Sequence, residues 1–172
     1  MIEQFKNHNL NAQIHYGVDK NDINDKYLNN LLNEGKITQN YINESQKSKK
    51  GPLACLLTHC GLWEKLKNSD KNHFLIFEDD CRILSNFENK AREYLQEVPE
   101  DWDMIWLGHG KLKGDKISKN VLIPKNDAGP KLNSLHHCYM IKKSSIDKIL
   151  NIIYPLNEPK SKDNILKKNY DK

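Results

Sequence analysis

Residues 73–80 decide the fold and read His73-Phe74-Leu75-Ile76-Phe77-Glu78-Asp79-Asp80. A continuous apolar run of this length is typical of a β-strand that is buried on both faces of a sheet. The run stops abruptly at three adjacent acids. We therefore expect the strand 74–77 to lie inside a sheet, with the carboxylates at its C-terminal end in a cleft.

The segments on either side alternate between helical and strand patterns. Residues 51–66 open with Gly51-Pro52 and then space apolar side chains three and four residues apart, which predicts a helix. Further helices are expected at 2–9, 22–34, 86–98 and 146–153, the last capped by Ser144 and Asp147. Strands are expected at 13–18, 104–107 and 138–141, and residues 40–50 are interpreted as an exposed loop. This alternation predicts an α/β fold with a largely parallel sheet.

Composition limits the classes of function. The 172 residues fit one domain, 1–172, with an N-terminal part at 1–50 and a core at 51–166. The net charge of +4 comes from lysines spread along the chain, so we expect no nucleic-acid surface. No stretch has the length of a membrane span or the pattern of a signal peptide, and we expect a cytoplasmic protein. The four cysteines lack zinc-ligand spacing and are expected to be reduced.

The acids at the strand end are candidate metal ligands. In open α/β sheets, ligands bind beyond the carboxyl ends of the strands. Residues two apart in an extended segment point the same way, so Glu78 and Asp80 could converge on one hard cation that also binds substrate phosphates. The alternative is an acidic turn that closes the strand and is capped by Arg82. The triplet by itself leaves both interpretations open.

Four motifs in order resemble glycosyltransferase family 25, which includes lipopolysaccharide-core transferases and collagen hydroxylysine galactosyltransferases. The family pattern is a G-x-x-x-C-x-x-S-H-x-x-x-W helix, an I-x-E-D-D strand end, a W-D-x-x-x-L-G strand and an H-A-Y-L-I strand. The corresponding residues here are Gly51, Cys55, Thr58, His59 and Trp63; Ile76 and Glu78-Asp79-Asp80; Trp102-Asp103 with Leu107-Gly108; and His137-Cys138-Tyr139-Met140-Ile141.

The resemblance implies a GT-A fold, which is a Rossmann-like nucleotide-sugar-binding sheet flanked by helices. It also implies a UDP-sugar donor and manganese or magnesium, with Glu78 and Asp80 as metal ligands. His137 is a candidate third ligand, because neutral imidazole binds manganese, although it could be a plain strand residue.

The resemblance further suggests residues for the donor and the chemistry. Asp79, His59 and Asp19 are candidate donor-binding residues, with helix packing as the alternative for His59. The implied reaction is inverting transfer of galactose or glucose to a hydroxyl on a glycan, lipopolysaccharide or collagen-like protein. Such transfer needs a general base on the acceptor hydroxyl, for which Asp163 and Asp103 are candidates.

The chain departs from the family pattern in one main respect. The family opens with an I-N-L-x-R-R-x-x-R strand and helix that has no counterpart here, so we expect a truncated sheet lacking its first strand. Such a sheet would expose a central edge. The competing hypothesis is therefore a degenerate, non-catalytic domain that binds a nucleotide sugar or a glycan. A two-metal phosphodiesterase would need further acids at neighbouring strand ends, and the sequence shows none.

Overall fold

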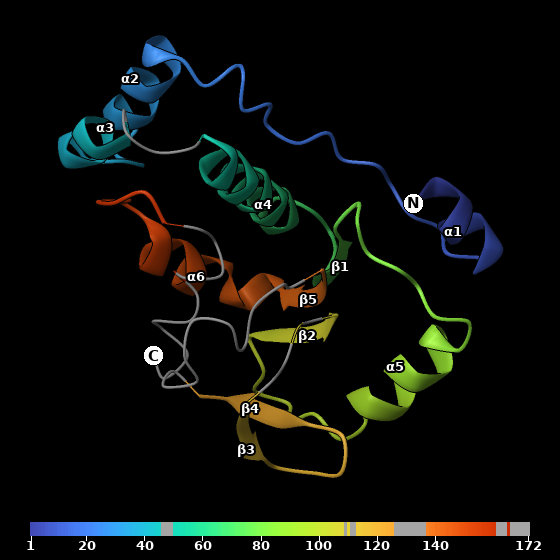
Figure 1. Ribbon diagram of the computed structural model, residues 1–172. Coiled ribbons are helices and arrows are strands. Elements are labelled where there is room, and N and C mark those ends of the chain that lie inside the picture. The colour runs from blue at the N-terminus through green and yellow to red at the C-terminus, as the bar shows by residue number, and fades with distance from the viewer. Residues whose placement is uncertain (46–49, 109, 111–112, 126–136, 161–164, 166–172) are drawn as a thin grey trace. The chain divides into compact units, whose positions relative to one another are not determined.

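The computed structural model describes residues 1–45, 50–108, 110, 113–125, 137–160 and 165 (Figure 1). The chain divides into two compact units. We call the described residues of 1–14 and 72–142 the sheet unit, and those of 15–71 and 143–169 the helical unit. The assignment of 1–172 to one domain stays a prediction.

The sheet unit is built on three strands, β1 (His73–Phe77), β2 (Met104–Gly108) and β5 (Cys138–Lys142). Their order is β1-β5-β2, and β5 runs antiparallel to both neighbours (Figure 1). A small antiparallel hairpin of β3 (Gly114–Lys116) and β4 (Leu122–Pro124) completes the unit. The prediction of a mixed α/β fold is confirmed, but the prediction of a largely parallel sheet is wrong. The two strands that run the same way, β1 and β2, are separated by β5, and no local sequence pattern shows which strands become neighbours.

Strand β1 lies at an edge of this sheet within the described residues, so its predicted place inside the sheet is wrong. Its burial on both faces is also not observed, because His73 is exposed and Leu75 is 38% exposed while Ile76 is 7% exposed. The ring of Phe77 packs edge-on against Phe5 at 5.3 Å between centroids and against Phe87 at 5.6 Å. These contacts join β1 to α1 (Ile2–Asn7) and α5 (Phe87–Leu95).

The helical unit is centred on α4 (Gly51–Lys67), whose bounds match the prediction closely. Its apolar stripe is buried, and Leu56, Trp63 and Leu66 have no exposed surface. Two C-terminal elements contact α4, the short 3-10 helix η2 (Lys143–Ser145) and α6 (Ile146–Ile153). On the N-terminal side, α2 (Asp25–Asn33) begins where the side chain of Asn24 accepts the Tyr27 N–H at 3.0 Å.

Three local predictions fail. Residues 40–45, expected as loop, belong to α3 (Gln39–Ser45), where Tyr41 is 3% exposed and anchors a mostly polar helix. Residues 13–18 form neither helix nor strand. The predicted cap by Ser144 and Asp147 is replaced by Ser145 at the N-cap of α6, whose side chain makes no capping hydrogen bond. No helix among the described residues is long and apolar enough to span a membrane.

Candidate metal centre

The acidic triplet lies on a tight turn that follows β1. The backbone N–H of Cys81 donates to the carbonyl of Glu78 at 3.1 Å, which closes a β-turn with Asp79 and Asp80 at its two central positions. Aspartate is common in such turns because its short polar side chain bonds readily to nearby backbone groups. The Glu78 N–H in turn donates to the His137 carbonyl at 2.8 Å, which ties the start of the turn to the residue before β5.

This arrangement brings the three predicted metal ligands together. The ligand atoms of Glu78, Asp80 and His137 all lie within 4.8 Å of one another. His137 arrives there through the sheet register, since β5 begins at Cys138 opposite Phe77. We expected the side chains of Glu78 and Asp80 to converge because residues two apart in an extended segment point the same way. The convergence arises instead from the turn, which folds Asp80 back toward His137.

Asp80 and His137 are in direct contact. The Nδ1 of His137 lies 3.1 Å from the Oδ1 of Asp80, with the two side chains 29% and 65% exposed. Glu78 is half-buried. The competing interpretation, a turn capped by Arg82, finds no support, because Arg82 makes no ion pair with the three acids in the part of the chain that the structure describes.

The donor set fits a divalent cation. Ligand atoms on adjacent vertices of an octahedral ion with bonds of about 2.1 Å lie about 3 Å apart, which matches the separation between Asp80 and His137. Carboxylate oxygens are ligands that hard divalent cations prefer, and neutral imidazole binds transition-metal ions. Three protein ligands leave positions for phosphate oxygens.

The remaining predicted residues of the sheet unit lie in different places. Asp79 is exposed on the same turn, next to the ligand group. Asp103 precedes β2, and its carbonyl accepts the N–H of Lys142 at the C-terminal end of β5. His137 stands at the opposite end of β5, about 17 Å away for five residues of strand. The structure therefore does not bring Asp103 to the metal centre, and Asp163 lies outside the described residues.

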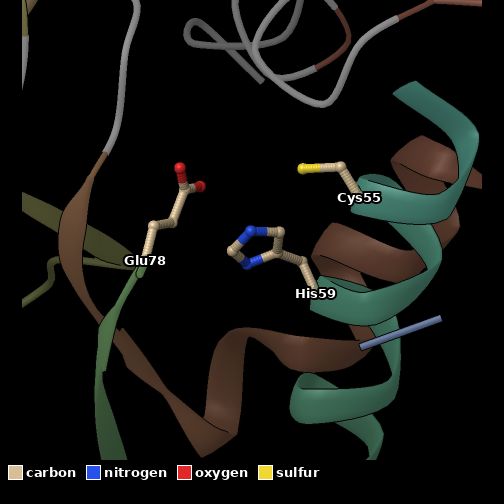
Figure 2. A group of neighbouring side chains, drawn as sticks. All are labelled: Cys55, His59 and Glu78. Atoms are coloured by element: carbon tan, nitrogen blue, oxygen red, sulfur yellow. The ribbon is translucent and has the colours of Figure 1, made fainter. Parts of the chain in front are cut away.

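The two candidates in the helical unit have local roles in the structure. His59 is 5% exposed, with its ring centroid 6.3 Å from that of Trp63. Figure 2 shows His59 and Cys55 projecting from successive turns of α4, and Glu78 following β1. Cys55 is exposed, and it is the cysteine of the helix motif that resembles the family pattern. Asp19 accepts the N–H of Asn21 at 2.8 Å within an exposed turn.

The four cysteines are free thiols. Burial raises the pKa of Cys60 to about 12 and raises that of Cys138 further. Both thiols therefore stay protonated at neutral pH.

Comparison with known proteins places the chain in a family. The sequence model described as glycosyltransferase family 25 (LPS biosynthesis protein) matches residues 1–166. Procollagen galactosyltransferase 1 of Danio rerio is 31% identical over 75 residues, which are 42% of this chain and 12% of that protein. Procollagen galactosyltransferase 1-A of Xenopus laevis is 26% identical over 126 residues, 72% of this chain and 20% of that protein.

A third relative carries a different description. The inactive glycosyltransferase 25 family member 3 of Homo sapiens is 33% identical over 70 residues, 39% of this chain and 12% of that protein. The matches thus span between 12% and 20% of the length of these three relatives. Because the family match covers nearly all of the chain and includes the acidic turn, this protein belongs to glycosyltransferase family 25.

Proposed function

We propose that the chain is a metal-dependent glycosyltransferase that transfers galactose or glucose from a UDP-sugar to a hydroxyl acceptor, with inversion at the anomeric carbon. The observation that carries the proposal is the convergence of Glu78, Asp80 and His137 at the end of β1. Family membership supports the same reaction class. The proposal includes a GT-A arrangement, in which the acidic turn lies at the donor diphosphate.

In this proposal the chain's own residues bind and orient the donor. Glu78, Asp80 and His137 hold the cation, and the tie between the Glu78 N–H and the His137 carbonyl fixes two of the three ligands to adjacent strands. A bound manganese ion neutralises charge on the diphosphate and makes it a better leaving group. Asp79, exposed beside the ligands, contacts a hydroxyl of the ribose or the sugar.

The base and the other donor contacts remain proposals from the resemblance. Asp163 is the candidate base, because Asp103 lies at the far end of the sheet. His59 and Asp19 are proposed donor-binding residues. Among relatives, those named procollagen galactosyltransferase favour galactose as the sugar and a hydroxylated protein as the acceptor, ahead of a glycan or lipopolysaccharide.

A second candidate function is a non-catalytic family member that binds a nucleotide sugar or a glycan. The relatives named inactive or probably inactive in Homo sapiens and Bos taurus support it, at 33% and 31% identity. The convergence of Glu78, Asp80 and His137 at the acidic turn supports the enzyme instead.

A thermal-shift screen tests the proposed function. The chain is heated with UDP-, GDP- and CMP-sugars, each with manganese or with EDTA. A ligand at 100 times its Kd raises the free energy of unfolding by about 2.7 kcal/mol, so a specific donor is visible as a higher Tm. We expect a manganese-dependent shift with UDP-sugars alone. If no nucleotide sugar gives a manganese-dependent shift in Tm, the proposal is wrong. If a nucleotide sugar binds but is transferred to no acceptor, the non-catalytic alternative is favoured.

A further inference from the structure

A side-chain clamp holds the backbone that follows the acidic turn. Gln4, on α1, donates from Nε2 to the carbonyl of Cys81 at 3.0 Å and accepts the N–H of Ile83 on Oε1 at 2.8 Å. The side-chain amide of Gln4 therefore donates one hydrogen bond and accepts another, to backbone groups of residues two apart. A peptide unit of a neighbouring strand makes the same pair of bonds. The residues involved are 77 and 79 positions apart in the sequence.

The clamp completes the support of the turn. On one side, the Glu78 N–H is bonded to the His137 carbonyl. On the other side, Cys81 is bonded through its N–H to Glu78 and through its carbonyl to Gln4. The packing of Phe5 against the end of β1 sets α1 at the distance from which Gln4 reaches these groups.

Asp80 depends on this support more than the other two ligands do. Glu78 directly follows β1, and His137 directly precedes β5, so the sheet orients both. Asp80 lies at the third position of the turn with a side chain that is 65% exposed, and its backbone continues directly into Cys81. A ligand on an unsupported turn has to be ordered when a cation binds, and that ordering weakens binding.

We propose that Gln4 is a positioning residue for the metal centre, acting on Asp80 through the backbone of Cys81 and Ile83. The inference rests on the proposed function, since it assumes that Glu78, Asp80 and His137 bind a divalent cation. It assigns a role in the site to a helix that precedes β1 by more than sixty residues in the sequence.

The test measures manganese binding and backbone protection in the full chain. Gln4→Met keeps the length of the side chain and removes both hydrogen bonds, and Gln4→Ala is the second variant if the first folds poorly. Gln39→Ala is the matched control, because Gln39 is an exposed helical glutamine bonded to Asn43 within α3. Ile149→Val, in the buried face of α6, serves as a variant of lowered stability. Manganese affinity is measured by electron paramagnetic resonance, and amide exchange by NMR.

We expect Gln4→Met to raise the Kd for manganese about tenfold, the low end of the range for groups that orient metal ligands. The Ile83 amide should exchange about tenfold faster or more, because its acceptor is gone. Both control variants should keep the manganese affinity of the parent.

Four results would overturn the inference. Unchanged Ile83 exchange in Gln4→Met would show that no clamp exists. Equal manganese affinity in the parent and Gln4→Met would show that the clamp does not position Asp80, and the proposed function would stand. An equal loss of manganese affinity in Ile149→Val and Gln4→Met would show that Gln4 affects binding only through the stability of the fold. A parent that binds no manganese would remove the proposed function and this inference together.

Discussion

Asp80→Asn removes one negative charge from the metal centre and preserves the shape of the side chain. The amide oxygen of asparagine can still accept a hydrogen bond from Nδ1 of His137, which lies 3.1 Å from the present carboxylate. Because Asp80 is 65% exposed and His137 29%, loss of the charge should change the free energy of unfolding by no more than about 1 kcal/mol. The fold should therefore survive, with an unfolding midpoint close to that of the parent.

Manganese binding should respond much more strongly than stability. The variant leaves Glu78 as the one carboxylate of the three-ligand group, and a lost charged contact costs about 1–3 kcal/mol. The Kd for manganese should then rise by about 5- to 150-fold, at 1.4 kcal/mol for each factor of ten. Electron paramagnetic resonance of free manganese gives this Kd, and thermal unfolding of the same samples gives the stability.

Asp79→Asn is the matched control for this experiment. It changes the same charge on the same turn, at a residue that lies outside the ligand group. Ligation by Asp80 predicts a large effect at Asp80 and a small one at Asp79, because removal of a neighbouring exposed charge alters the field at the site only slightly. Equal effects of the two variants would refute direct ligation and leave a general attraction of cations to an acidic turn.

Three further predictions concern the stability and reactivity of the helical unit. Thr58→Val should lower the free energy of unfolding by about 1–3 kcal/mol in urea titrations, since the Val18 N–H loses its acceptor at 2.9 Å, and Thr58→Ser should be nearly neutral. Leu56→Ala should cost about 2–5 kcal/mol in the same assay, because this side chain is fully buried. Stability should fall as the pH rises from about 8.5, where an unfolded thiol ionises, toward the pKa of about 12 of buried Cys60, and the fall should be smaller in Cys60→Ala. The three predictions would be contradicted, respectively, if Thr58→Val and Thr58→Ser changed the free energy of unfolding equally, if Leu56→Ala left it unchanged, or if the stability of the parent did not vary with pH in this range.

The elements with strong local signals were predicted well. Helix α4 has Pro52 in its first turn and a break at Asn68, and β1 ends at the first acid, so the chain itself marks their bounds. Helix α3 was missed, because a short polar helix is stabilised by the burial of one side chain, Tyr41, in tertiary contacts. Burial of this kind cannot be deduced from a polar stretch of sequence.

The order of the strands also depends on contacts far apart in the chain. An apolar run such as 73–77 predicts a strand, but its position at an edge or in the centre depends on which partners pair with it. The insertion of β5 between β1 and β2 pairs residues that are at least 30 positions apart in the sequence. This pairing made the sheet antiparallel, against the expectation from the alternation of helices and strands.

The sequence predicted which side chains lie together at the end of β1 better than it predicted their geometry. The acidic triplet at a strand end pointed to Glu78 and Asp80, and His137 came from the resemblance; metal binding by the three stays a prediction. The β-turn that folds Asp80 toward His137 was not predicted, since it depends on the hydrogen bond between Cys81 and Glu78. Gln4 was missed because a single glutamine on a surface helix has no sequence signal of a long-range contact.

Calorimetric titration of the parent with UDP-galactose, once with manganese and once with EDTA, tests whether the donor binds through a metal ion. We expect binding in manganese, loss of binding in EDTA, and a weaker response to manganese in Asp80→Asn. Binding that is equal with and without manganese would contradict a metal centre at Glu78, Asp80 and His137. No binding of UDP-galactose or UDP-glucose under either condition would contradict the proposed transferase itself.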